Sequence, residues 1–269
     1  MSAGVVVVGA GIVGASVASE LAGRGLDVLL LDRGEVSGGT TGLGEGNVLC
    51  SDKDAGPELA LTVAGMALWD ELEARLGDVA RIRRKGALIV HPEAATWERE
   101  PERLARLAAA GAEGALIGPE EVREREPWLT GDLLGASLFP SDLQCAPRAI
   151  VRALAASPGV TVRTGCEVRG VVVRGGRVEG VDTAEGPVAA GAVVLCAGVW
   201  TGSLAATAGV ALPLEPRKGQ LLRLRVDAPS PRAIVHKVID GSYLRSVASA
   251  DAGLQVTTVL ETTWDGHVL

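Results

Sequence analysis

A glycine-rich turn near the amino terminus constrains the fold more than any other feature of this chain. Residues 5–8 are four valines, and Gly9, Gly11 and Gly14 follow them in the spacing G-x-G-x-x-G. A short run of β-branched residues is typical of a strand buried on both faces of a parallel sheet. The next residues place apolar side chains at helical spacing as far as Gly25. The pattern predicts a strand, a tight turn and a helix.

A second apolar run, LDVLLLD, follows this helix and ends at Asp32. The two strands and the helix have the length of one βαβ unit. Asp32 lies at the spacing from the glycines at which an acid accepts hydrogen bonds from ribose hydroxyls. The glycines permit a tight turn, close approach of a pyrophosphate and close packing of helix on strand. The sequence therefore predicts a dinucleotide site at Gly9, Ala10, Gly11, Ile12, Val13, Gly14 and Asp32.

Composition excludes several other classes of protein. A formal net charge of −7 argues against nucleic acid as a partner. The four cysteines and three histidines lack metal-ligand spacing, so we expect reduced thiols and no metal site. No basic residue precedes the first apolar run, and charged residues interrupt the next one, which argues against a signal peptide and a membrane span. We expect a cytoplasmic protein.

The remaining pattern predicts an α/β fold in which insertions interrupt a parallel sheet. A long helix over 56–77, a helix over 95–111 and a charged helix over 119–128 are expected, and the charges of 99–107 and 120–128 are expected to form solvated faces. Several short strands lead to a buried strand at 192–198 that runs into glycine. Alternation in 220–226 and 254–261 predicts antiparallel sheet.

These features together resemble one family, the FAD-dependent amine and amino-acid oxidoreductases. Its members include glycine oxidase, D-amino-acid oxidase, sarcosine oxidase and the flavin subunits of hydrogen cyanide synthase and hydroxyproline dehydrogenase. The resemblance covers essentially all 269 residues, through the glycine turn with Asp32-Arg33, GTTGLGEGN, TGCEVRGV, VVLCAGVWTGSL and EPRKGQ. It implies FAD as cofactor and a discontinuous Rossmann-type FAD-binding domain at 1–80 and 141–212. An α+β substrate domain with antiparallel sheet would occupy 81–140 and 213–269.

The resemblance also implies further cofactor-binding residues. The loop after the second strand would wrap the flavin pyrophosphate, the residue matching Val168 would meet the adenine through its backbone, and the strand end at 197–200 would pass beside the phosphates. The residues so implied are Arg33, Thr40, Thr41, Gly46, Asn47, Val168, Ala197, Gly198 and Trp200. Two alternatives stay open: the glycine-rich loop as a plain connection, and Trp200 as a core aromatic residue.

The implied chemistry is oxidation of a small amine or amino acid by hydride transfer to flavin N5, with the cofactor supplying the redox chemistry. No residue is assigned to catalysis. An amino-acid substrate needs a cation for its carboxylate. The Gly-Leu-Arg-Pro-like stretch that supplies it in the family does not occur here, so the candidates are Tyr243 and Arg245, with an ordinary strand as the alternative.

The end of the chain departs from the family pattern. Asp265-Gly266 predicts a hairpin, and only three residues follow it, too few to pair fully with 254–261. We therefore expect an enzyme that lacks its C-terminal part. Two other hypotheses stay open. In one, the chain is an inactive flavin-binding fragment or a half-enzyme that a partner chain completes. In the other, it is an NAD(P)-dependent dehydrogenase. The FAD-dependent enzyme that we expect is compatible with a partner subunit or a separate electron acceptor.

Overall fold

The computed structural model describes residues 2–225, 234–244, 259–263 and 267–269. The chain forms two compact units, one made of Met1–Gly46 and Ala146–Gly219, the other of Asn47–Cys145 and Gln220–Leu269. These boundaries differ from the expected ones chiefly in residues 47–80. That segment belongs to the second unit because its Leu59 packs in one core with Ile89 and Phe139.

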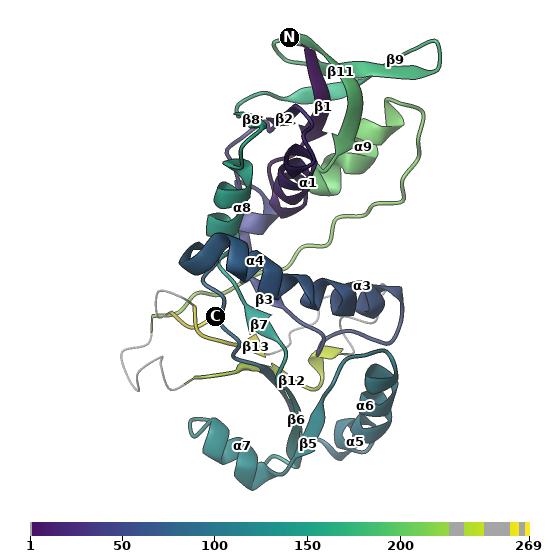
Figure 1. The fold of residues 1–269 in the computed structure, drawn as a ribbon. Coiled ribbons are helices and arrows are strands. Elements are labelled where there is room, and N and C mark those ends of the chain that lie inside the picture. The colour runs from purple at the N-terminus through teal and green to yellow at the C-terminus, as the bar shows by residue number, and fades with distance from the viewer. Residues whose placement is uncertain (1, 226–233, 245–258, 264–266) are drawn as a thin grey trace. The chain divides into compact units, whose positions relative to one another are not determined.

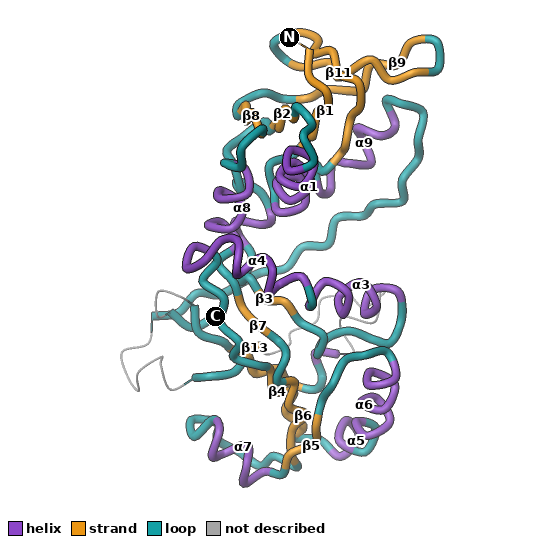
Figure 2. Tube along the Cα trace, in the orientation of Figure 1, coloured by secondary structure: helices purple, strands orange, loops and turns teal. Residues whose placement is uncertain are grey.

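The first unit contains a six-stranded sheet (Figures 1 and 2). Its strand order is β8-β2-β1-β11-β10-β9. In chain order the strands are β1 (Ser2–Val8), β2 (Val28–Leu31), β8 (Val160–Arg163), β9 (Val168–Arg174), β10 (Arg177–Thr183) and β11 (Gly186–Leu195). β1 pairs in parallel with β2 on one side and with β11 on the other, and β2 pairs in parallel with β8. β10 and β9 continue the sheet in antiparallel fashion.

This arrangement confirms the predicted fold class. The central strands are buried because Val6, Val7, Leu30 and Leu31 are fully covered, as expected for a parallel sheet with both faces packed. The carboxyl ends of β1, β2 and β11 meet at one edge, since all three strands are parallel. In open α/β sheets, this is the edge at which ligands bind.

Helices of the first unit are α1 (Ile12–Gly23), α2 (Thr40–Leu43), α8 (Pro147–Ala155) and α9 (Thr201–Ala206), with a 3-10 turn η2 (Gly198–Trp200). α1 begins directly after the glycine turn, as the sequence predicts. α8 packs beside α1. It buries Ile150, Val151 and Leu154, and Ser157 just beyond its end shares a 2.8 Å hydrogen bond with Ser19 of α1.

The second unit contains a five-stranded sheet in the order β13-β12-β4-β6-β5 and a small sheet of β3 and β7. The strands are β3 (Asn47–Val48), β4 (Ala87–His91), β5 (Ala115–Ile117), β6 (Gly135–Phe139), β7 (Leu143–Gln144), β12 (Lys237–Asp240) and β13 (Val259–Leu260). β4 is parallel to β12 and antiparallel to β6. The sheet is therefore mixed, with antiparallel pairs in the majority.

Helices of the second unit are α3 (Pro57–Met66), α4 (Leu68–Leu76), α5 (Ala94–Trp97), α6 (Glu100–Ala109) and α7 (Pro119–Arg125), with a 3-10 turn η1 (Gly77–Val79). The single helix predicted over 56–77 is divided into α3 and α4 at Ala67. The helix predicted over 95–111 is likewise divided into α5 and α6. Apolar periodicity does not reveal such breaks, since both pieces keep the same pattern.

The strand expected over 220–226 is wrong for the residues that the structure describes. Residues 220–225 form one isolated antiparallel bridge, between Leu224 and Val268, and no named strand. Leu222 is 75% exposed, so the alternation there does not mark a half-buried face. The predicted strand over 254–261 is represented by β13, which is antiparallel to β12. Residues 254–258 and Asp265-Gly266 lie outside the described residues.

The charged helices are less solvated than the sequence predicts. Glu100, Arg103 and Glu126 are buried. Arg103 donates to both carboxylate oxygens of Glu100, and Glu100 also accepts a hydrogen bond from Ser137. Charged residues of this kind are buried only when they are paired. The expectation of a purely solvated face is therefore corrected for these three residues.

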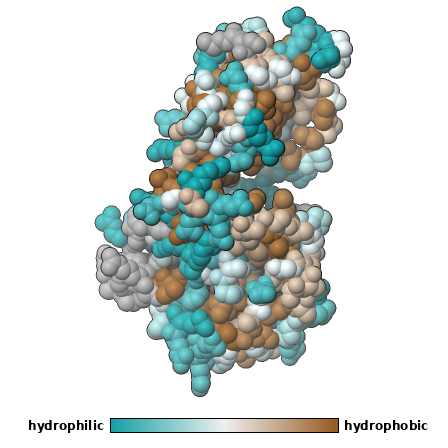
Figure 3. All heavy atoms as spheres, viewed as in Figure 1, coloured by the Kyte–Doolittle hydropathy of each residue, from teal (hydrophilic) through white to brown (hydrophobic). Residues whose placement is uncertain are grey.

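Hydrophobic side chains also reach the surface, where they lie among hydrophilic ones (Figure 3). In the first unit the exposed apolar residues include Val13, Leu43, Val199 and Trp200. All four come from segments that the sequence predicts to hold a cofactor. Among the described residues, no helix combines the length and the apolar character needed to span a membrane.

Candidate functional site

The glycine turn after β1 has the tight geometry that its sequence predicts. Gly9 has a φ of +106°, a conformation that favours glycine. A Cβ on Gly9 would lie 2.4 Å from the carbonyl oxygen of Cys196, and one on Gly14 would lie 1.8 Å from the carbonyl oxygen of Gly9. Neither position can hold a side chain without movement of the backbone. The turn brings the start of α1 against the ends of β1 and β11.

Asp32 fixes this turn from the end of the neighbouring strand. Its Oδ2 accepts a hydrogen bond from the backbone N–H of Ala10 at 2.7 Å, and its Oδ1 accepts one from Gly34 at 2.8 Å. An ionised carboxylate has about four acceptor positions. Asp32 can therefore hold the turn and still accept hydrogen bonds from ribose hydroxyls.

The loop after β2 returns to the glycine turn at two points. The N–H of Ser37 donates to the carbonyl oxygen of Ala10 at 2.9 Å, and the Oγ1 of Thr41 accepts from the N–H of Ile12 at 3.1 Å. Thr40 and Thr41 form the first turn of α2. The loop is thus packed onto the start of α1, which disfavours its interpretation as a plain connection.

Ser37 is a residue that sequence reasoning missed. It is buried, its φ is +63°, and among the described residues its Oγ has no hydrogen-bond partner. A buried hydroxyl normally has a partner, and a non-glycine residue with positive φ is uncommon. Neither property can be read from a serine in a glycine-rich loop. Strain and an unsatisfied hydroxyl beside the turn mark this loop as a candidate binding element.

Arg33 and Trp200 are in contact in the structure. The guanidinium carbon of Arg33 lies 3.9 Å from the centroid of the Trp200 ring, a cation–π geometry. Trp200 is 47% exposed, so it is not a buried core residue. Ala197 and Gly198 precede it, and Gly198 has a φ of +56°. The contact joins the segment after β2 to the segment after β11.

Val168 begins β9 and is buried in the core of the first unit. The segment before it runs beside Asp32, because Cys166 donates its N–H to the carbonyl oxygen of Asp32 at 2.9 Å and Gly165 donates to Gly34 at 3.1 Å. The structure therefore brings the backbone near Val168 to the strand end that holds Asp32.

Two residues of the predicted loop fall on opposite sides of the boundary between the units. Gly46, with a φ of +82°, ends the first segment of the first unit. Asn47 begins the second unit, where its Nδ2 donates to Glu261 at 2.6 Å. Glu261 is buried and also accepts from Lys85 at 2.5 Å and from Gln144 at 3.0 Å. Asn47 thus belongs to a buried polar network that the sequence did not reveal.

The candidate substrate residues are only partly described. Tyr243 follows β12, so it does not lie in the strand that was expected, and it packs against the core formed by Leu59, Ile89 and Phe139. Arg245 lies outside the described residues. The assignment of both residues to a substrate stays a prediction.

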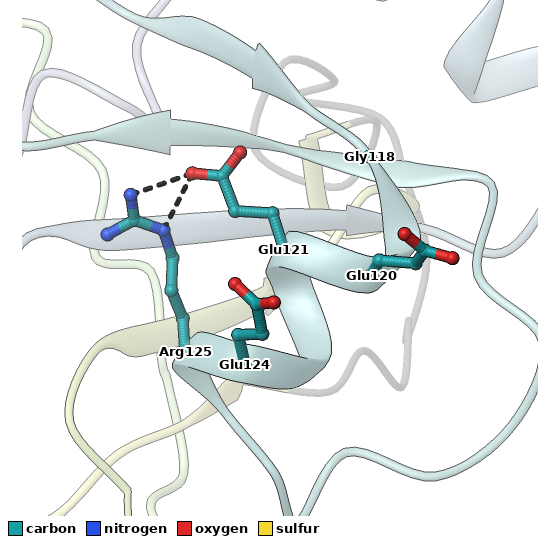
Figure 4. A pocket seen from close by; sticks show the side chains of 5 residues that line it. All are labelled: Gly118, Glu120, Glu121, Glu124 and Arg125. Carbon is teal, nitrogen blue, oxygen red and sulfur yellow. Dashed lines mark hydrogen bonds and ion pairs between the residues drawn. The ribbon is translucent and has the colours of Figure 1, made fainter.

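A surface hollow on α7 contains none of the predicted residues (Figure 4). It is lined by Gly118, Glu120, Glu121, Glu124 and Arg125. Arg125 pairs with Glu121 one turn earlier, at 2.7 Å. This is the solvated helix face that the charge pattern predicts for these residues.

The four cysteines are free thiols at buried or half-buried positions. No group of three His, Cys, Asp or Glu side chains among the described residues could hold a metal ion. Burial raises the pKa of Cys50 to about 11 and that of Cys145 to about 12. Thiols with such pKa values are poor nucleophiles at neutral pH.

The residues at the strand ends fit a dinucleotide cofactor. The glycines leave a cradle without side chains, α1 presents the N-terminus of a twelve-residue helix, and Arg33 contributes a positive charge. Helix N-termini bind phosphate through their free N–H groups and the helix dipole. Gly9–Gly14, Asp32, Arg33, Thr41 and Ala197–Trp200 would form this site.

Comparisons with known proteins agree with this geometry. The chain is 32% identical over 235 residues to a glycine oxidase from Pseudomonas putida, covering 82% of this chain and 62% of that protein. It is 28% identical over 269 residues to the bifunctional protein ThiO/ThiG of Nostoc, of which it covers 40%. It is 31% identical over 255 residues to 4-methylaminobutanoate oxidase of Paenarthrobacter nicotinovorans, covering 88% of this chain and 30% of that protein. The chain thus spans 30–62% of the length of these relatives.

Solved structures share the fold. Glycine oxidase from Geobacillus kaustophilus superposes with a TM-score of 0.82 at 24% identity, over 99% of this chain and 70% of that one. L-proline dehydrogenase from P. horikoshii gives a TM-score of 0.81 at 22% identity, over 99% and 68%. The model of the family described as FAD dependent oxidoreductase matches residues 4–266. Turn, sheet and comparisons lead to one conclusion, which confirms the resemblance seen in the sequence: this chain belongs to the family of FAD-dependent oxidoreductases.

Proposed function

We propose that the chain binds FAD with its first unit, along the carboxyl ends of β2, β1 and β11, and oxidises a small amine or amino acid. The main support is the position of Asp32, which holds the N–H of Ala10 at 2.7 Å and keeps acceptor positions for a ribose. This links the predicted sugar-binding acid directly to the predicted phosphate-binding turn.

In this proposal each residue has a physical role. Gly11 and Val13 at the start of α1 would receive the pyrophosphate through their N–H groups, and Thr40 and Thr41 would donate hydroxyl hydrogen bonds to it. Arg33 adds positive charge on the same side and holds the ring of Trp200 at 3.9 Å. The exposed apolar side chains of Val13, Leu43 and Val199 suit a large aromatic cofactor.

FAD held by the glycine turn, Asp32 and Arg33 would supply a two-electron acceptor for oxidation of the substrate carbon that bears nitrogen, and the resulting imine would hydrolyse in water. The protein contributes position and electrostatics. Relatives named glycine oxidase and 4-methylaminobutanoate oxidase support an amine or amino acid as substrate. Oxygen or a partner protein would take the electrons from the reduced cofactor.

Titration of the full chain with FAD, followed by visible absorbance and flavin fluorescence, tests the proposal. We expect binding near one FAD per chain, and at least tenfold weaker binding in Asp32→Asn, which places an amide against a backbone N–H. Asp27→Asn is the matched control, since Asp27 is exposed and lies just before β2. NADH and NADPH are the competing ligands.

Failure to bind FAD, or binding of NADH in preference, would sink the proposal. Anaerobic addition of glycine, N-methylated amino acids and proline to the loaded protein then tests the substrate class. Bleaching of the flavin absorbance by one of them is the expected result, and bleaching by none would limit the function to cofactor binding.

A further inference from the structure

A surface arginine of α8 contacts the loop that we assign to the cofactor. The Nε of Arg148 donates to the carbonyl oxygen of Gly42 at 2.7 Å. A Cβ added to Gly42 would lie 3.1 Å from the guanidinium carbon of Arg148, so the guanidinium also packs against the backbone at that position. Arg148 thus covers the middle of α2.

The position of Arg148 is not explained by the stability of its own helix. It lies in the first turn of α8, immediately after Pro147, where a positive charge opposes the helix dipole. It is exposed, so it contributes little to the core. A cation at this place costs some helix stability, which points to a role in the contact that it makes.

α8 is a rigid support for such a contact. Its Ile150, Val151 and Leu154 are buried, and it packs against α1. The hydrogen bond between Ser157 and Ser19 fixes the far end of this packing. Arg148 is therefore held by the element that also supports the phosphate-binding helix.

Gly42 lies at a position of the loop where the backbone leaves no room for a side chain. A Cβ there would lie 2.0 Å from the carbonyl oxygen of Ser37, so the turn closes only with glycine. Its neighbour Thr41 accepts the hydrogen bond from Ile12. A force that holds the carbonyl of Gly42 therefore also holds Thr41 against the start of α1.

We propose that Arg148 is a positioning residue, which sets the affinity for FAD by fixing Thr40 and Thr41 through the carbonyl of Gly42, without contact with the cofactor. The inference rests on the proposed function, in which these threonines bind FAD. Loss of Arg148 frees the loop, and binding then includes the cost of ordering it.

The first test is FAD titration of the full chain carrying Arg148→Ala, Arg148→Lys or Arg152→Ala. We expect a loss of affinity on the order of tenfold in Arg148→Ala, the size of one charge-assisted hydrogen bond. Arg148→Lys recovers part of it, because an ammonium group also donates to a carbonyl. Millimolar ethylguanidinium restores binding in Arg148→Ala. Arg152→Ala, an exposed arginine of the same helix, binds FAD as the wild type does.

The second test is a double-mutant cycle with Thr41→Val. If Arg148 acts through these threonines, the loss of affinity caused by Arg148→Ala is smaller in the Thr41→Val background than in the wild type. Fully additive losses, equal affinity of wild type and Arg148→Ala, or a loss that follows a lower melting temperature and ignores ethylguanidinium would each overturn the inference. A wild-type chain that does not bind FAD would instead refute the proposed function.

Discussion

Arg33 and Trp200 stack at 3.9 Å although they follow different strands, β2 and β11, which are separated in the sheet by β1. The contact spans the carboxyl end of β1, where the glycine turn begins. It therefore joins both sides of the proposed cofactor site in the protein itself. The site depends on residues far apart in sequence, and its integrity can be tested one contact at a time.

Replacing Trp200 by alanine is expected to weaken FAD binding about three- to tenfold, because an exposed cation–π pair contributes roughly 0.5–1 kcal/mol and an apolar surface is lost with it. Arg33→Met tests the other partner and removes the charge as well. FAD titration measures both, with Arg24→Met at the exposed end of α1 as the control. Unchanged affinity in both variants would show that the stack lies away from the cofactor.

Substitution of Gly14 by alanine should prevent FAD binding and lower the melting temperature of the apoprotein. The added Cβ would lie 1.8 Å from the carbonyl oxygen of Gly9, so the turn must open. Gly23→Ala is the matched control, because it lies in the same helix with no heavy atom within 4 Å of the added Cβ. Alanine there should stabilise the helix by roughly 0.5–1 kcal/mol. A Gly14→Ala protein with normal flavin content would contradict the geometry of the turn.

Glu126→Gln should destabilise the second unit. The buried carboxylate of Glu126 accepts hydrogen bonds from the N–H groups of Val235 and His236, from the ring of His236 and from Trp128. An amide cannot accept all of them, so we expect a loss of about 2–4 kcal/mol in urea unfolding. Glu124→Gln, on the surface hollow of α7, should be neutral within about 0.5 kcal/mol.

The same carboxylate predicts a dependence on pH. Its hydrogen bonds hold the pKa of Glu126 below the ordinary value of 4.5 despite its burial. The stability that it contributes is therefore present above pH 4.5 and is lost as the pH falls through the lower pKa of the folded state. The free energies of unfolding of the wild type and of Glu126→Gln should therefore approach each other as the pH falls below 4.5. Free energies that stay equally far apart down to pH 3 would refute this assignment.

The stability that Asp142 contributes should change with pH in the opposite direction. Its burial raises its pKa from 3.8 to about 6, so its contribution to stability is fully present below pH 3.8 and is lost as the pH rises through 6. The shift corresponds to about 3 kcal/mol between these limits. Asp142→Asn cannot ionise, so it should lack this pH-dependent contribution to the free energy of unfolding. The difference in unfolding free energy between this variant and the wild type should therefore change between pH 4 and 7. A constant difference would rule this contribution out.

Local sequence predicted the first βαβ unit and the position of Asp32 well. Local backbone geometry explains the glycine spacing and the valine run, and Asp32 follows directly after the second strand. The structure confirms the strands and the helix that these features predict. The strand over 220–226 failed because alternation does not tell whether a partner strand or a core is present. Leu222 alternates correctly and is still 75% exposed.

Other features required the fold itself. Glu126 and Arg103 lie in charged runs that are typical of solvated helices, and only tertiary packing selects the members that are buried. The partner of Asn47 is Glu261, 214 residues away. Arg148 is an unremarkable surface arginine until α8 and α2 are placed together. Such pairs form only when the topology brings distant segments together. No local pattern in the sequence specifies which segments these are.

The parallel pairing of β1 with β11 has a consequence for synthesis. β1 ends at Val8 and β11 begins at Gly186, so at about 5–20 residues per second β11 leaves the ribosome roughly 10–35 s after its neighbour. During that interval one edge of a valine strand has no native partner. An uncovered apolar edge invites pairing with other chains. We therefore expect the yield of native protein to depend on chaperones that shield this strand until translation has reached β11.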